Sequence, residues 1–426
     1  MVKGLFKIHY VKNIMVLITG AAVAQALSLA LAPILSRLFD PGAFGILGVY
    51  VSITGIITVI SGGKYELAIL LPKEKKIAAN VFCLTLLIVF LVSLTTLILL
   101  FLLKPRIVMW FDLAELSSLI WFIPLSIFLG GSYNALNYWN TRNKFFNNLS
   151  ISRIIQAVGR EGSQVGIGLI SNLQAVGLTV GYLFGQFISV INLIILTLNN
   201  DRHIIYSSIN IRYLKKVAKD YTDFPKYSAS QSFLNSLSSN LPAILLTYYF
   251  GAATAGLYWF THRILLAPNQ LIGNAVRQAF YQKANELNNK DISTKKLFVK
   301  TTLGLASIGI IPLLIVSIFG PFLFEFAFGS EWFMAGVYSK WLIIYWFFIF
   351  INPPSVMMFP ILNRQKIHLL IDSVYLVLRL IVLIIGGLKN DSILAIALFS
   401  GVGVVKNTFI IIYINFYLNS TKQMQV

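Results

Sequence analysis

The chain has 426 residues, of which 57% are hydrophobic and only 12% are charged, and its mean hydropathy is +0.78. Soluble domains carry roughly 25% charged residues, so this composition argues against a soluble protein and favours one whose outer surface contacts lipid. Lys and Arg outnumber Asp and Glu by 34 to 15. The single cysteine, Cys83, excludes intramolecular disulfides and cysteine-based metal sites.

Helices that cross a membrane are predicted along the whole chain. The N-terminal segment carries Lys3, Lys7 and Lys12 and continues into an apolar stretch too long for a signal peptide, so we expect a retained first helix. Apolar runs of roughly 20 residues follow, the length that an α-helix needs to span a bilayer. The predicted spans are 13–36, 44–62, 77–103, 116–139, 149–170, 173–198, 227–250, 255–280, 297–319, 338–360, 368–388 and 392–418.

Short connections and prolines constrain these helices. Only Ser171 and Asn172 separate two of them, and residues 251–254 separate another two, so each pair is expected to be antiparallel. Pro353 and Pro354 should interrupt the helix predicted over 338–360, because proline removes a backbone donor and clashes with the preceding turn.

The distribution of basic residues predicts that both termini face the cytoplasm. Most Lys and Arg residues fall in alternate connecting segments, the bias typical of cytoplasmic loops. The intervening segments hold only Arg37, Lys104, Arg106, Lys340 and Lys389. Topology and attraction to anionic lipid headgroups account for the net charge of +19, so nucleic-acid binding is not expected.

The polar stretch near the centre of the chain divides it into equal halves. We predict a six-helix lobe over 1–198, a basic cytoplasmic linker over 199–226 and a second six-helix lobe over 227–426. A weak similarity between residues 39–45 and residues 250–256 is consistent with a parallel repeat. Transporters built from such repeats bind substrate at the interface of the halves.

Charged residues predicted at membrane depth are the main candidates for binding. Such residues are costly in lipid and usually face a cavity. The cations are Arg160, Arg263, Arg379 and Lys406, whereas Glu161 is the one acid at similar depth. Amide side chains at helical spacing accompany them, and we predict that they line the same chamber: Gln231, Asn235, Gln270 and Asn274. Arginine suits phosphate, and amides suit sugars.

Structural roles are open for the same residues. Polar stripes also join membrane helices to one another, Arg160 and Glu161 could form an ion pair, and Lys406 could extend toward the headgroups. Phosphate-binding glycine-rich loops and the motifs of metalloproteases and serine hydrolases are missing. No cofactor or metal is therefore expected.

Two sequence motifs resemble a known family. Ser36-Arg37-Leu38-Phe39-Asp40-Pro41 leads into Phe44-Gly45, and Gly63-Lys64-Tyr65-Glu66-Leu67-Ala68-Ile69 leads into Leu71-Pro72-Lys73. These runs resemble the Wzx-type polysaccharide flippases, the O-antigen and exopolysaccharide translocases of the multidrug/oligosaccharidyl-lipid/polysaccharide exporter superfamily. Beyond about residue 80 the resemblance is one of helix layout alone. The residues that match the motif, or that we assign to a cytoplasmic gate, are Arg37, Pro41, Lys64, Tyr65 and Glu66.

The resemblance implies an all-α membrane fold of about twelve helices in two lobes, like that of the multidrug (MATE) exporters. It implies a flippase that moves undecaprenyl-diphosphate-linked oligosaccharide across a bacterial cytoplasmic (inner) membrane for surface polysaccharide synthesis, with the polymerase and chain-length proteins of that pathway as partners. A cation-lined lumen would receive the diphosphate. Glu161 and Glu66 are candidates for proton coupling, because burial raises a carboxyl pKa, although Glu66 could equally only pair with Lys64.

Two other functions are compatible with such a chain. A drug exporter of the same fold is one, but an exporter of organic cations would require deep carboxylates, and here the deep bases outnumber the acids. A membrane polysaccharide polymerase or glycosyltransferase is the other, but the predicted outer loops are too short to hold a catalytic domain.

Overall fold

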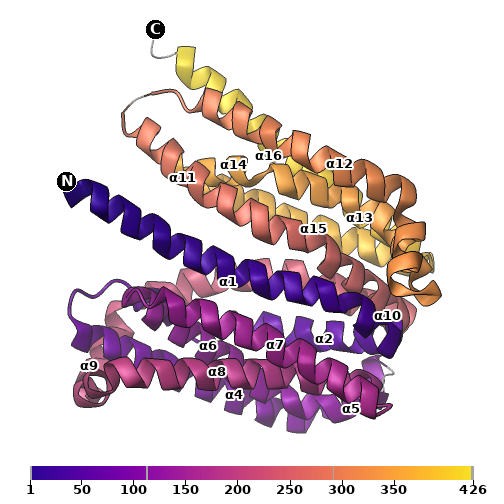
Figure 1. Ribbon diagram of the computed structural model, residues 1–426, viewed down its shortest axis with the longest axis horizontal. Helices are drawn as coiled ribbons and strands as arrows, with labels where there is room; N and C mark the ends of the chain where they lie inside the picture. Colours follow the sequence, from indigo (N-terminus) through magenta and orange to yellow (C-terminus); the bar gives the residue numbers. More distant parts are fainter. Residues whose placement is uncertain (1, 112–113, 291, 424–426) are drawn as a thin grey trace. The chain divides into compact units, whose positions relative to one another are not determined.

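The computed structural model describes residues 2–111, 114–290 and 292–423 and divides into two compact units, Met1–Ala253 and Thr254–Val426. Within these described residues every regular element is helical and no strand occurs, as predicted (Figure 1). Figure 1 also shows the helices of each unit running roughly alongside one another, as in a bundle. We describe each unit by itself.

The first unit contains α1 (Val2–Leu38), α2 (Pro41–Thr58), α3 (Tyr65–Ala68), α4 (Lys75–Phe111), α5 (Ala114–Leu119), α6 (Ile123–Arg142), α7 (Phe146–Ile170), α8 (Gln174–Ser208), α9 (Ile211–Asp220) and the first part of α10 (Ala229–Pro268). The second unit contains the remainder of α10, then α11 (Asn274–Asn288), α12 (Lys295–Phe328), α13 (Phe333–Ile351), α14 (Pro353–Ile361), α15 (Gln365–Leu388) and α16 (Ser392–Gln423).

Ten segments of the described chain are long and apolar enough to cross a membrane. One of them, Phe224–Asn288, runs through two predicted helices, which the structure separates only by a break at Gly251. The predicted span 149–170 is present as α7 but is not among the ten, because it carries three charged residues, Arg153, Arg160 and Glu161. The all-helical membrane class is confirmed, whereas the count of twelve and the orientation of the termini stay predictions.

The helix boundaries follow from local sequence. Asp40 caps α2 by accepting a hydrogen bond from the Ala43 backbone N–H at 2.7 Å, and Pro41 occupies the first turn, where no donor is needed. The prolines of the second unit act as predicted, because α13 ends at Ile351 and α14 begins at Pro353. The predicted tight connection after α7 is also present, since α8 begins at Gln174.

Gly251 lies at the point where α10 breaks. Its backbone angles, φ 82° and ψ 173°, are outside the helical region and in a part of conformational space that essentially only glycine adopts. A residue with a Cβ would be strained here. The glycine therefore separates the two membrane helices that the sequence predicts on either side of residues 251–254.

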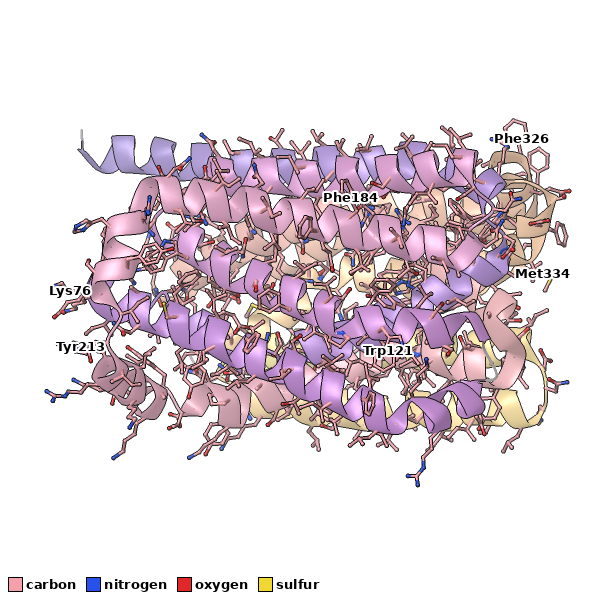
Figure 2. All side chains as sticks on the ribbon, turned by 90° about the horizontal axis from the view of Figure 1, so that it is seen from below. Lys76, Trp121, Phe184, Tyr213, Phe326 and Met334 are labelled. Atoms are coloured by element: carbon pink, nitrogen blue, oxygen red, sulfur yellow. The ribbon has the colours of Figure 1, made fainter. Side chains whose placement is uncertain are left out.

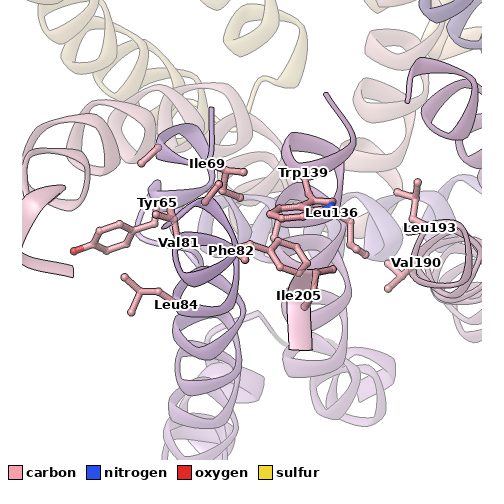
Figure 3. Packing of buried hydrophobic residues seen from close by; sticks show 14 of the residues in the cluster. Tyr65, Ile69, Val81, Phe82, Leu84, Leu136, Trp139, Val190, Leu193 and Ile205 are labelled. Atoms are coloured by element: carbon pink, nitrogen blue, oxygen red, sulfur yellow. The ribbon is translucent and has the colours of Figure 1, made fainter. Parts of the chain in front are cut away.

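A packed apolar cluster holds together one end of the first unit. Figure 3 shows Phe82 of α4 beside Trp139 of α6, and their ring centroids are 5.2 Å apart. Trp139 is fully buried. Leu193 and Ile205 of α8 and Val217 of α9 belong to the same cluster, so α9 is bound to the helices rather than extending freely.

Apolar side chains also face outward, as a lipid environment allows. On α4, Phe101 is 73% exposed, and on α12, Phe326 is 76% exposed. In the first unit, Figure 2 shows Lys76 and Tyr213 at one end of the helices and Trp121 toward the other. The predicted linker is largely helical, since α8 continues to Ser208 and α9 follows.

Candidate functional site

Arg160 and Glu161 are adjacent on α7 and form a buried polar group with Ser28 of α1. Arg160 donates to Glu161 Oε1 from Nε at 2.9 Å and from Nη2 at 2.7 Å. Ser28 Oγ donates to the same oxygen at 2.8 Å and accepts from Arg160 Nη2 at 2.7 Å. The Glu161 side chain has no exposed surface, whereas that of Arg160 is 27% exposed. The charge of Arg160 is therefore balanced by that of its neighbour, while its side chain stays partly exposed.

Arg379 of α15 is held in a different way, among aromatic rings of the second unit. Its guanidinium carbon lies 4.2 Å from the centroid of Phe399, 4.6 Å from that of Tyr375 and 5.8 Å from that of Tyr345. Nη2 also donates to the Tyr345 hydroxyl at 3.3 Å. Arg379 is only 5% exposed. Cation–π attraction to several rings, strongest where water is excluded, stabilises the charge here.

Lys406 of α16 and Asp372 of α15 form an ion pair beside this arginine. Lys406 Nζ lies 2.6 Å from Asp372 Oδ1 and 4.4 Å from the centroid of Tyr375. The second carboxylate oxygen lies 3.7 Å from His368 Nε2, and the His368 ring stacks on Phe359 with centroids 4.5 Å apart. The side chains of Lys406 and Asp372 are 20% and 19% exposed. Tyr375 therefore lies within reach of two cations, Arg379 and Lys406.

The other residues that we predicted to line the chamber are Arg263 and four amides. The described contacts join none of them to the groups around Arg160 or Arg379. Arg263 is half-buried on α10, with its guanidinium 5.8 Å from the centroid of the Trp259 ring. The four predicted amides are exposed and are divided between the units, two in each: Gln231, Asn235, Gln270 and Asn274. Their role as a lining stays a prediction.

The first motif forms the junction of α1 and α2. Arg37 is exposed, Pro41 starts α2, and the Asp40 backbone N–H donates to Gln174 Oε1 of α8 at 3.1 Å. Phe39 is 2% exposed, and its ring approaches Gly168 so closely that a Cβ there would lie 2.9 Å from it. These residues therefore fix the corner of the fold where four helices meet.

The second motif lies beyond the opposite end of α2. The Lys64 backbone is left-handed, with φ 59°, and Lys64 Nζ lies 3.6 Å from Glu66 Oε1. Glu66 is 3% exposed, and burial raises the pKa of its carboxyl, while Lys64 opposes the shift. The Tyr65 hydroxyl donates to the Ala218 carbonyl of α9 at 2.8 Å. The five motif residues therefore form two separate groups.

The second unit brings together side chains of the kind that bind phosphate. Arg379 and Lys406 both lie over Tyr375, Lys406 pairs with Asp372, and both cation types bind phosphate. Sequence reasoning missed His368 and Tyr375, although they lie with Asp372 and Arg379 at helical spacing on one face of α15. Among the described residues no cluster of His, Cys, Asp and Glu could hold a metal ion.

Residues 34–335 match the family model described as polysaccharide biosynthesis protein. The chain belongs to this family. The matched range begins before the first motif, contains the whole of α10 and ends within α13. A search of curated proteins finds no match.

Solved structures with a similar fold are membrane transporters. A multidrug resistance MATE family transporter of the MOP superfamily, in an inward-facing conformation, matches with a TM-score of 0.71, 13% identity and 96% of each chain covered. The lipid II flippase MurJ matches with a TM-score of 0.72, 14% identity and coverage of 95% of this chain and 87% of that one. A MOP superfamily transporter from Pyrococcus furiosus, whose binding pocket is described as reversed in polarity, has a TM-score of 0.59 at 13% identity, with 96% of each chain covered.

Proposed function

We propose that the protein is a flippase that moves undecaprenyl-diphosphate-linked oligosaccharide from the inner to the outer leaflet of a bacterial cytoplasmic membrane. It would work by alternating access through a cationic lumen, in the synthesis of a surface polysaccharide such as O-antigen, capsule or exopolysaccharide. The family assignment supports the pathway, and the fold shared with MurJ and the MATE transporters supports transport.

The two cations gathered at Tyr375 in the second unit are the observation that carries the proposal. Arg379 and Lys406 both lie over the Tyr375 ring, and Lys406 also pairs with Asp372. Arginine and lysine are the side chains that bind phosphate, and a lipid-linked diphosphate is an anion of that kind. Several groups that each bind weakly would let the substrate leave on the outer side.

The same cluster disfavours export of organic cations. Aromatic rings are the groups that recognise such ligands, but here the rings of Tyr345, Tyr375 and Phe399 already contact Arg379. A cationic drug would have to approach the positive charges of Arg379 and Lys406.

The proposal is tested in a host strain that lacks the gene, by asking on which membrane face the lipid-diphosphate oligosaccharide accumulates. A complete repeat unit confined to the cytoplasmic face is the expected result. A repeat unit that reaches the outer face without being polymerised would instead indicate a polymerase or ligase. Unchanged lipid intermediates together with altered drug sensitivity would indicate an exporter.

Anionic lipid is the second partner that we propose, at α9. The helix carries Arg212, Lys215, Lys216 and Lys219, while Val217 is buried against the unit. Ile211 remains 74% exposed. A basic helix with an exposed apolar residue is typical of one that lies at the membrane surface. Vesicles containing phosphatidylglycerol should bind a peptide of residues 199–226 more strongly than neutral vesicles do.

A further inference from the structure

Asp372 lies where it can compete with an anionic substrate for Lys406. On α15, His368, Asp372, Tyr375 and Arg379 follow one another at helical spacing and so share a face. Lys406 of α16 lies against that face, with Nζ 2.6 Å from Asp372 Oδ1. The charge of Lys406 is therefore already engaged before any ligand arrives.

Accessibility distinguishes this pair from the neighbouring arginine. Lys406 and Asp372 are each about one-fifth exposed, at 20% and 19%, whereas Arg379 is 5% exposed. The Lys406 side chain therefore keeps an exposed part that the Arg379 side chain, packed among its aromatic rings, lacks. Opposite charges attract at this range, so two anions that approach the same ammonium group compete for it.

The displaced carboxylate would retain polar neighbours. His368 Nε2 lies 3.7 Å from Asp372 Oδ2, the oxygen that does not face Lys406 most closely, and stacking on Phe359 fixes the imidazole ring. A small rotation of the Asp372 side chain toward His368 would bring the two groups into hydrogen-bonding distance. Tyr375 meanwhile keeps its ring beneath Lys406, with 4.4 Å between Nζ and the ring centroid. The arrangement therefore supports Lys406 in both states.

We propose that the diphosphate of the lipid-linked substrate takes Lys406 from Asp372 on binding, and that Asp372 takes it back on release. This inference rests on the proposed function and adds the regulation of its anion site. Asp372 is a positioning residue in this scheme, since it acts through Lys406 and does not touch the substrate. Its effect is to keep affinity low enough for the substrate to leave.

The test measures binding and turnover on the full-length protein in lipid nanodiscs, with farnesyl diphosphate as a short prenyl diphosphate probe. Asp372→Asn should bind the probe about 3- to 10-fold more tightly, the range expected when a partly exposed charge partner is removed. The same variant should lower surface polymer output in the host, because release slows. Tighter binding combined with lower output is a result that a merely structural role would not give. Asp372→Glu should restore both values toward those of the natural protein.

Glu286→Gln is the matched control. Glu286 also pairs with lysines, Lys283 at 3.1 Å and Lys290 at 3.2 Å, but it lies exposed on α11. This substitution changes the net charge by the same amount and should leave probe affinity unchanged. Equal tightening by both variants would mean that net charge alone controls affinity, and would overturn the inference.

A paired variant covers the case in which Asp372→Asn does not fold. Asp372→Asn combined with Lys406→Gln replaces the ion pair with two neutral groups that can hydrogen-bond, and it should bind the probe more weakly than the natural protein. Unchanged affinity in this double variant would show that Lys406 does not hold phosphate.

If the natural protein itself bound no probe, and the deletion strain accumulated no lipid intermediate, the proposed function would fail together with this inference. Normal binding with no effect of Asp372 would refute the inference alone.

Discussion

Two arginines, one half-buried in the first unit and one buried in the second, are stabilised by different chemistry. Arg160 in the first unit is paired with the carboxylate of Glu161 next to it in sequence, with Nη2 2.7 Å from Oε1. Arg379 in the second unit lies among three aromatic rings and hydrogen-bonds the Tyr345 hydroxyl. A carboxylate cancels a charge, whereas an aromatic face stabilises it and leaves it positive. This difference is the reason why we propose the anion site in the second unit.

Replacing Arg379 should have the largest effect and tests this difference most directly. Arg379→Ala removes the charge and leaves a cavity between Tyr345, Tyr375 and Phe399, so we expect a loss of about 3–5 kcal/mol of stability and no detectable surface polymer. Thermal unfolding of the purified protein and surface-polymer staining of the complemented deletion strain measure the two effects.

Arg379→Lys is the control for the charge. It keeps a cation in the cage but loses the planar group that stacks on the rings, so output should recover in part. Full activity of the Arg379→Ala variant at normal protein level would show that this cation plays no part in transport.

Arg160→Ala should have the next largest effect, and on folding rather than on substrate binding. It removes the cation that pairs with the fully buried Glu161 carboxylate, which costs about 3 kcal/mol by comparison with other broken buried pairs. Adding Glu161→Gln should restore most of this stability, because the carboxylate charge that Arg160 neutralises is then absent as well. The unfolding midpoints of Arg160→Ala and of the double variant measure how much stability is restored. If the double variant were as unstable as Arg160→Ala, neutralisation would not be the role of the pair.

The sequence was sufficient for the class of fold and for the charged residues, but not for how those charges are stabilised. Hydropathy reveals membrane helices directly, and Arg160 next to Glu161 suggests an ion pair at once. Ser28, which joins that pair, is 133 residues away from Glu161 and could be found only from packing. The same holds for Arg379, whose rings come from three helices, α13, α15 and α16. Helical spacing on α15 was a usable signal for Tyr375 and His368, since it does not depend on tertiary contacts.

Glu66 is a second carboxylate of the first unit that is buried beside a cation, as Glu161 is beside Arg160. Because burial raises its folded-state pKa, its stabilising contribution is fully present below the ordinary carboxyl pKa and is lost as the pH rises through the raised value. Glu66→Gln should therefore be more stable than the natural protein at neutral pH and lose this advantage in acid. Unfolding midpoints between pH 4 and pH 8, with the exposed Glu74→Gln as the control, measure the difference. A constant difference at every pH would contradict the shift.

Tyr65→Phe should have the smallest effect on stability, and it separates the role of Tyr65 from that of the adjacent Glu66. Tyr65→Phe removes the hydrogen bond from the Tyr65 hydroxyl to the Ala218 carbonyl, at 2.8 Å, but keeps the buried ring. We expect a loss of about 0.5–1.5 kcal/mol, the usual net value of one hydrogen bond, with the pH dependence that belongs to Glu66 intact. Since Ala218 lies on α9, hydrogen exchange should quicken in α9 before it does elsewhere in the first unit. Protection of α9 that was unchanged in Tyr65→Phe would show that apolar packing through Val217 alone holds this helix in place.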